Sequence, residues 1–145
     1  MILLKKYQDE AVNDFSEKLY KLLKKPNARH NLIFKAPTGA GKTIMMAAFL
    51  NRICEELPER YELEKRKAAF IWIAPNKLYI QSYNALKGYF AEMRSIKPIF
   101  FEDVIDCELQ PNEVLFVNWE SINKEKNTMI KENETNKNLY SFINK

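Results

Sequence analysis

The chain has 145 residues, the size of one domain, and 46% of them are hydrophobic and 29% charged, so it can bury a core. No apolar run approaches the ~18 residues of a membrane-spanning helix, and the N-terminus is not a signal peptide, which argues against a membrane or secreted protein. The net charge of +4 is compatible with a polyanionic partner without requiring one. Cys54 and Cys107 have no neighbours at metal-ligand spacing, which predicts two reduced thiols in a cytoplasmic protein.

Hydrophobic periodicity predicts helix, strand and helix in the first part of the chain. Apolar residues recur at three- and four-residue steps from Leu4 to Lys25, which predicts an amphipathic helix that Pro26 ends. Asn31 to Ala36 is a short apolar run and predicts a strand. Thr43 to Leu57 again has a helical pattern, which Pro58 is expected to stop.

The second part of the chain begins after a charged connection, ERYELEKRK. Ala68 to Ala74 is an apolar run that predicts a strand buried on both faces. Asn76 to about Met93 predicts a helix, and KPIFFED and EVLFVNW predict two further strands. Strands that alternate with long helices indicate an α/β fold with a parallel sheet. The polar residues after position 122 predict loop or disorder.

The stretch KAPTGAGKT, Lys35 to Thr43, holds two of the three glycines and lies between a predicted strand and a predicted helix. Backbone N–H groups can surround a phosphate only where the chain curls tightly without a β-carbon in the way, and glycine permits this. A helix that begins directly afterwards adds free N–H groups and its positive end. We therefore predict a nucleotide-phosphate cradle formed by Thr38, Gly39, Ala40 and Gly41.

Lys42 and Thr43 complete this motif at the start of the predicted helix. A lysine at this place reaches the outer phosphates, so we assign Lys42 both binding and a catalytic role. The Thr43 hydroxyl is the predicted Mg²⁺ ligand. The generic pattern begins with glycine where this chain has Ala36, so a simple glycine-containing turn before a helix remains the alternative.

The spelling APTGAGKT resembles motif I of superfamily two helicases and translocases. Upstream, LKKYQDEAV resembles the Q motif of the same families, in which a glutamine reads the adenine edge. The resemblance implies this role for Gln8 and ATP as the nucleotide, and an amide that both donates and accepts suits adenine. A solvated helix residue is the alternative interpretation of Gln8.

Two later stretches extend the resemblance to nucleic-acid contacts. FIWIAPNKLYIQSYNALK resembles motif Ia, whose turn touches the nucleic-acid backbone, and this implies contacts from Asn76 and Lys77. An ordinary turn with Asn76 as the helix cap is the alternative. EVLFVNWESINKEKN is most similar to the Res subunit of type III restriction–modification enzymes and implies that Asn118 and Ser121 line the nucleic-acid path. Trp119 could stack on a base, but we favour a packed core aromatic.

This resemblance covers essentially the whole chain and implies a P-loop NTPase (RecA-like) fold, three-layer α/β/α with a mostly parallel sheet, incomplete at its C-terminus. Residues 1–122 would form the N-terminal part of the ATP-binding domain, and residues 123–145 a polar tail that leads toward a missing Asp-Glu strand. The implied function is the ATP-binding portion of a DNA translocase or helicase motor of a restriction-type enzyme, with weak contacts to the DNA backbone. The implied partners are the remaining motor or nuclease segment and a modification subunit.

Two other functions fit the same motif. A catalytically inactive P-loop remnant could act as an interaction or split-protein module, and a small-molecule kinase also uses a P-loop. Hydrolysis requires carboxylates that hold Mg²⁺ and orient the attacking water. In the family these come from an Asp-Glu motif. The only stretch here that is similar to this motif is FED, which ends at Asp103. We therefore expect no ATP turnover by this chain alone, and an open edge along NLIFKA.

Overall fold

In the computed structural model, the residues described are 3–25, 30–60, 68–92, 96–100, 103–104 and 108–122. Most of the predicted charged connection, the predicted polar tail 123–145 and Cys107 lie outside these ranges. Within the described part, no helix is both long and apolar enough to cross a membrane.

Three long helices form where the periodicity predicts them: α1 (Lys6–Leu23), α2 (Lys42–Arg60) and α3 (Leu78–Glu92). The prediction that Pro58 ends the second helix was wrong, because α2 continues to Arg60. A proline removes one backbone hydrogen bond of the helix, and the two residues beyond it keep helical geometry.

The sheet has three parallel strands: β1 (Phe70–Ala74), β2 (Lys97–Phe100) and β3 (Glu113–Asn118), in the order β1-β3-β2. This confirms an α/β fold with a parallel sheet. The last residues of β1 and β3, Ala74 and Asn118, are partners in the register, so the two strands end at the same level. One turn of helix, α4 (Trp119–Ile122), follows β3 directly and includes Trp119, which the sequence places at the end of the predicted strand EVLFVNW.

The prediction that the strand in Ala68–Ala74 is buried on both faces was wrong. Within the described part of the chain β1 pairs with β3 alone, and Ile73 is 45% exposed. The strand that is buried on both faces is β3, where Glu113 to Val117 are all buried. A central strand has a neighbour on each side, whereas an edge strand leaves a row of side chains and backbone groups open.

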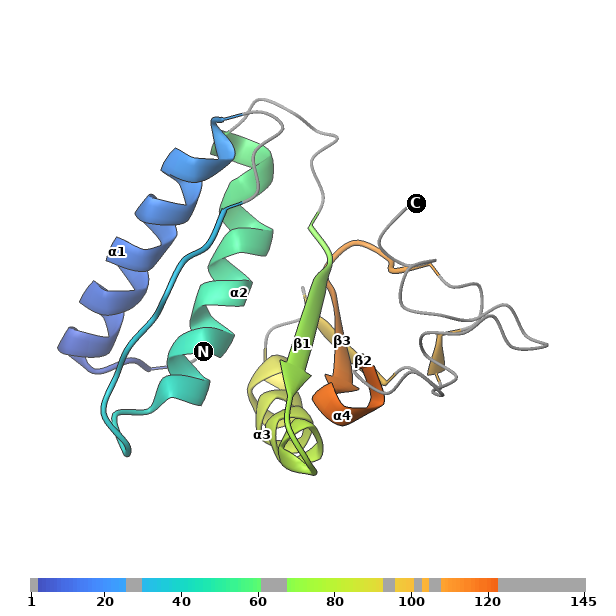
Figure 1. Ribbon diagram of the computed structural model, residues 1–145. Coiled ribbons are helices and arrows are strands. Elements are labelled where there is room, and N and C mark those ends of the chain that lie inside the picture. Colours follow the sequence, from blue (N-terminus) through green and yellow to red (C-terminus); the bar gives the residue numbers. More distant parts are fainter. Residues whose placement is uncertain are drawn as a thin grey trace.

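The residues Asn31–Ala36, which predict a strand, form none in the structure. Their burial still alternates as in a strand: Leu32, Phe34 and Ala36 are partly buried, whereas Ile33 is 78% exposed. Figure 1 shows this segment running beside α2, away from β1. A strand requires a hydrogen-bonded neighbour, and no described residue supplies one to this segment.

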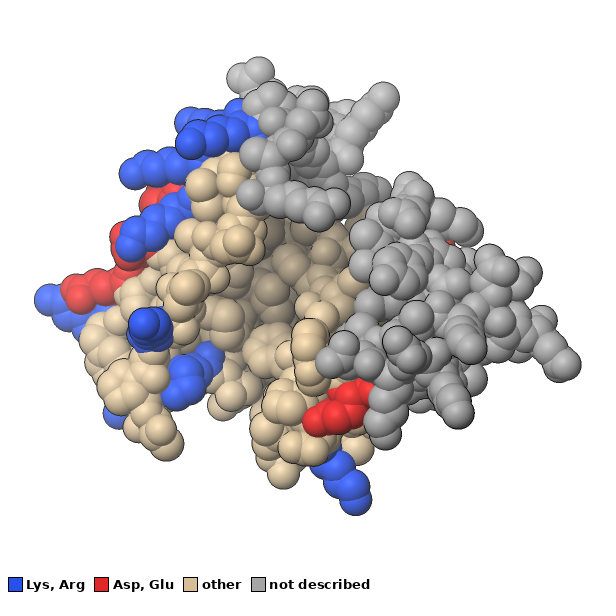
Figure 2. Space-filling view, in the orientation of Figure 1, with Lys and Arg blue, Asp and Glu red and all other residues tan. Residues whose placement is uncertain are grey.

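The helices pack in series: α1 lies against α2, α2 against α3, and α3 against the sheet. Val114 and Phe116 point from β3 into the core shared with these helices, while Leu115 and Val117 join a second cluster on the other face of the sheet. Figure 2 shows a hollow lined mainly by uncharged side chains between the α1–α2 pair and β1, and basic and acidic side chains interspersed along α1.

Candidate nucleotide site and adjoining strand ends

Residues 36–41, here called the glycine loop, curl tightly before α2 begins at Lys42. Gly39 has a φ of 81° and Gly41 a φ of 83°, the left-handed region that favours glycine. The N–H of Ala40 donates to the carbonyl of Pro37 at 3.2 Å and closes the curl. The two glycines thus occupy the positions where the backbone geometry requires them.

The first turn of α2 has N–H groups that can bind an anion. The first hydrogen bond back to the loop runs from the N–H of Met45 to the carbonyl of Gly41, at 3.0 Å. No described backbone group accepts from the N–H groups of Lys42, Thr43 or Ile44. Such free donors at a helix start favour a phosphate, so the loop fits the group that the sequence predicts.

The Lys42 side chain folds back onto the glycine loop. Its Nζ donates to the carbonyl oxygens of Ala36 and Pro37, at 3.1 and 2.9 Å. These acceptors are neutral, and the side chain is exposed. A phosphate oxygen is a stronger acceptor for an ammonium group because the hydrogen bond is then charge-assisted.

Gln8 is 6% exposed and packs under the glycine loop. Its Nε2 donates to the carbonyl of Ala40 at 2.9 Å, and its Oε1 accepts from the N–H of Lys5 at 2.9 Å. The hydroxyl of the half-exposed Tyr7 donates to the same Ala40 carbonyl, at 3.2 Å. The interpretation of Gln8 as a solvated helix residue is therefore wrong, and both ends of its amide already have partners inside the protein.

The two threonines predicted to act here lie on either side of the two glycines. Thr38 is exposed at the tip of the loop, and Thr43 is half-buried in the first turn of α2. Among the described residues, no group of three or more His, Cys, Asp or Glu side chains lies close enough together to hold a metal ion. The Thr43 hydroxyl as a Mg²⁺ ligand therefore stays a prediction.

The turns after β1 and β3 are joined through Glu120. Asn76 has a φ of 51°, and its N–H donates to both carboxylate oxygens of Glu120, at 2.9 and 2.8 Å. The N–H of Glu120 in turn donates to Oδ1 of Asn118 at 3.2 Å. A chain of hydrogen bonds therefore runs from Asn118 through Glu120 to Asn76.

The predicted nucleic-acid residues meet at these two turns. Asn76 and Lys77 are exposed, and Asn118 is half-buried with its carbonyl oxygen already engaged. Ser121 lies in α4, and its side chain is outside the described part. The interpretation of Trp119 as a packed core aromatic was wrong, because this residue is 49% exposed.

Sequence reasoning missed Glu120 altogether. An acidic residue two positions after a strand end gives no local signal of its partner, and only the parallel pairing of β1 with β3 brings it to Asn76. In Figure 1 the glycine loop and both of these turns lie at the same lower end of the molecule.

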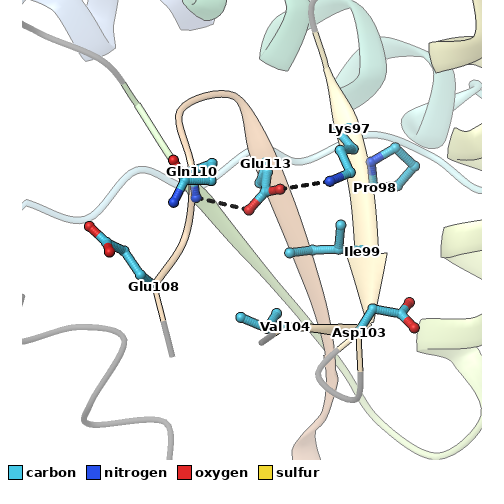
Figure 3. A pocket seen from close by; sticks show the side chains of 8 residues that line it. All are labelled: Lys97, Pro98, Ile99, Asp103, Val104, Glu108, Gln110 and Glu113. Carbon is cyan, nitrogen blue, oxygen red and sulfur yellow. Dashed lines mark hydrogen bonds and ion pairs between the residues drawn. The ribbon is translucent and has the colours of Figure 1, made fainter. Parts of the chain in front are cut away.

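Asp103, in the stretch that is most similar to an Asp-Glu motif, lies outside both the glycine loop and the two turns. It lines a cavity of about 400 Å³ beside β2 and the start of β3. In Figure 3, Glu113 links this cavity's walls: it accepts from Nζ of Lys97 at 3.1 Å and from the N–H of Gln110 at 2.8 Å. The residues that line the cavity include none from the glycine loop. Asp103 is therefore not part of the candidate nucleotide site.

One comparison with known proteins gives a match. A family model described as "Type III restriction enzyme, res subunit" matches residues 1–144. Comparisons with curated proteins and with solved structures found no significant match.

Proposed function

The chain belongs to the family of type III restriction enzyme Res subunits, and from this membership we propose that its glycine loop binds Mg·ATP. The family indicates a helicase-like, ATP-binding motor domain of a restriction enzyme. The observation that supports the nucleotide site is that Gly39 and Gly41, both with a left-handed φ, directly precede α2, whose first N–H groups have no partner among the described backbone groups.

In this proposal the phosphates lie on the first turn of α2. The N–H groups of Lys42, Thr43 and Ile44 donate to phosphate oxygens, and Lys42 exchanges its contacts with the Ala36 and Pro37 carbonyls for the outer phosphates. Thr43 holds Mg²⁺, which neutralises phosphate charge when it is bound. Thr38 and Ala40 line the curl.

We propose that the adenine lies beside Tyr7 and Gln8. Tyr7 is 49% exposed and its hydroxyl contacts the loop, so an aromatic residue that a base could contact lies next to the proposed phosphate site. Gln8 must exchange its hydrogen bond with the Ala40 carbonyl, or its bond with the Lys5 N–H, to reach an adenine edge. Nucleotide binding would thereby alter the contact between α1 and the glycine loop.

We further propose that DNA contacts the turns after β1 and β3. Lys77 and Asn76 would bind the sugar–phosphate backbone, with Asn118 and Ser121 beside them. Few phosphates can be reached from one such surface, so we expect weak binding that falls steeply with salt. In the family the partners are the remaining motor and nuclease segment and a modification subunit, which we extend to this chain as part of the proposal.

A titration with fluorescently labelled ATP in the presence of Mg²⁺, with and without an oligonucleotide, tests the proposed function. We expect saturable binding that unlabelled ATP reverses and that a set of small phosphate acceptors does not enhance. Enhancement by a small acceptor but not by DNA would instead favour a small-molecule kinase. No binding at all would favour an inactive P-loop module.

A further inference from the structure

We propose that Glu120 is an internal competitor of nucleic acid at the turn after β1. Its carboxylate occupies the N–H of Asn76, the backbone donor that a DNA phosphate would use there. This inference rests on the proposed DNA contact at Asn76 and Lys77, and it names the residue that regulates that contact.

The geometry of Glu120 is that of a bound anion. Both of its carboxylate oxygens accept from one backbone N–H, at 2.9 and 2.8 Å, as two oxygens of a phosphate could. The left-handed backbone of Asn76, with a φ of 51°, is the local conformation in which this contact is made. Glu120 is itself held by the hydrogen bond from its N–H to Asn118, so the carboxylate is directed at the turn.

The charges make the competition selective for anions. Lys77, directly after Asn76, is exposed and attracts a phosphate to this turn, whereas Glu120 repels it. A phosphate that takes the Asn76 N–H must therefore displace Glu120. Because Glu120 belongs to α4 and follows the exposed Trp119, its displacement would also change the turn after β3. The expected result is a low affinity for DNA that rises when the carboxylate is neutralised.

Glu120→Gln is the decisive variant, because its amide oxygen can still accept from Asn76 while the negative charge is removed. Glu108→Gln is the matched control: Glu108 is exposed, and it lines the cavity beside β2 instead of the turn. Fluorescence anisotropy with a labelled oligo-dT should show binding about three- to fivefold tighter for Glu120→Gln than for the wild type. The gain should shrink as salt is raised from about 50 mM to about 500 mM, because salt screens the repulsion.

Unchanged or weaker DNA binding by Glu120→Gln would overturn the inference. An equal gain in affinity from Glu108→Gln would also overturn it, because the change in net charge would then explain the gain. The amide ¹H–¹⁵N signal of Asn76 tests the hydrogen bond without DNA, and we expect it to move in Glu120→Gln and to stay in place in Glu108→Gln. If no form of the chain binds DNA, the proposed DNA contact fails. An unmoved Asn76 signal in Glu120→Gln would overturn the inference independently of that outcome.

Discussion

The side-chain amide of Gln8 fills the space that a β-carbon on Gly41 would need. A β-carbon placed there would lie 2.5 Å from Nε2 of Gln8 and 3.1 Å from Cγ2 of Ile44. Because the same Nε2 donates to the Ala40 carbonyl, the first helix and the glycine loop are fitted to each other at this point. The loop therefore depends on a residue that lies far from it in the sequence.

Gly41→Ala should destabilise the fold and weaken nucleotide binding, because the added β-carbon displaces the buried Gln8 amide from the Ala40 carbonyl and strains the backbone at a φ of 83°. We expect a loss of about 2–4 kcal/mol in the free energy of unfolding, measured by urea denaturation. Gly39→Ala is the matched control, since its φ is 81° but a β-carbon there meets nothing within 4 Å. Gly39→Ala should lower the free energy of unfolding only by the cost of a left-handed backbone at a residue with a β-carbon, about 1–2 kcal/mol. Equal losses in the two variants would contradict a role for Gln8 in the difference.

Lys42→Ala should weaken the binding of Mg·ATP at least about tenfold, since a hydrogen bond to a charged group contributes roughly 1.5–3 kcal/mol. Isothermal titration calorimetry measures the change. Lys35→Ala removes a neighbouring exposed lysine that precedes the loop, and it should leave the affinity nearly unchanged. Wild-type affinity in Lys42→Ala would exclude the glycine loop as the nucleotide site.

Gln8 should give the site a preference for ATP over GTP, because an amide that donates and accepts matches the adenine edge but not guanine in the same pose. Competition titrations with the two nucleotides measure this preference. In Gln8→Ala we expect the preference to disappear and the affinity for both nucleotides to fall, since the Ala40 contact is lost as well. Equal binding of ATP and GTP by the wild type would show that Gln8 supports the loop but does not select the base.

Trp119 should report nucleic-acid binding through its fluorescence, because it is 49% exposed beside the proposed DNA contacts. The other tryptophan, Trp72, is stacked against Phe116 with 5.8 Å between ring centroids, and serves as the internal reference. We expect quenching by oligo-dT that is absent in Trp119→Phe. Stacking on a base contributes about 1–3 kcal/mol, so Trp119→Ala should weaken binding correspondingly. Binding without quenching would place the DNA elsewhere.

The chain by itself should show no steady-state ATPase activity. Asp103 lines a cavity beside β2 whose lining includes no residue of the glycine loop or of α2, so it is not placed to complete a metal shell at Thr43. Asp103→Asn should therefore leave Mg·ATP binding unchanged. A phosphate-release assay measures whether the chain hydrolyses ATP. Turnover that Lys42→Ala abolishes would show that another carboxylate of this chain serves the reaction.

The pattern of local residues was sufficient to predict the three long helices, the parallel sheet and the curl of the glycine loop. Gly39 and Gly41 are required by backbone angles at their own positions, and α2 begins at Lys42, one residue before the start that the helical pattern predicts. The same local pattern predicts a strand at Asn31–Ala36 and a strand buried on both faces in Ala68–Ala74. Both predictions failed because a strand is completed by neighbours, which a local pattern does not specify.

Only the tertiary structure decided how the residues of the candidate site are connected. The sequence by itself selects Gln8, Lys42, Asn76 and Asn118 by type and order, and it leaves the amide of Gln8 free to bind adenine. The fold instead uses that amide to hold the Ala40 carbonyl, and it brings Glu120 to the N–H of Asn76 through the parallel pairing of β1 and β3. Conformation at one residue follows from its own chemistry and its near neighbours. Hydrogen bonds between residues far apart in the chain form only after packing has set the distance between their elements.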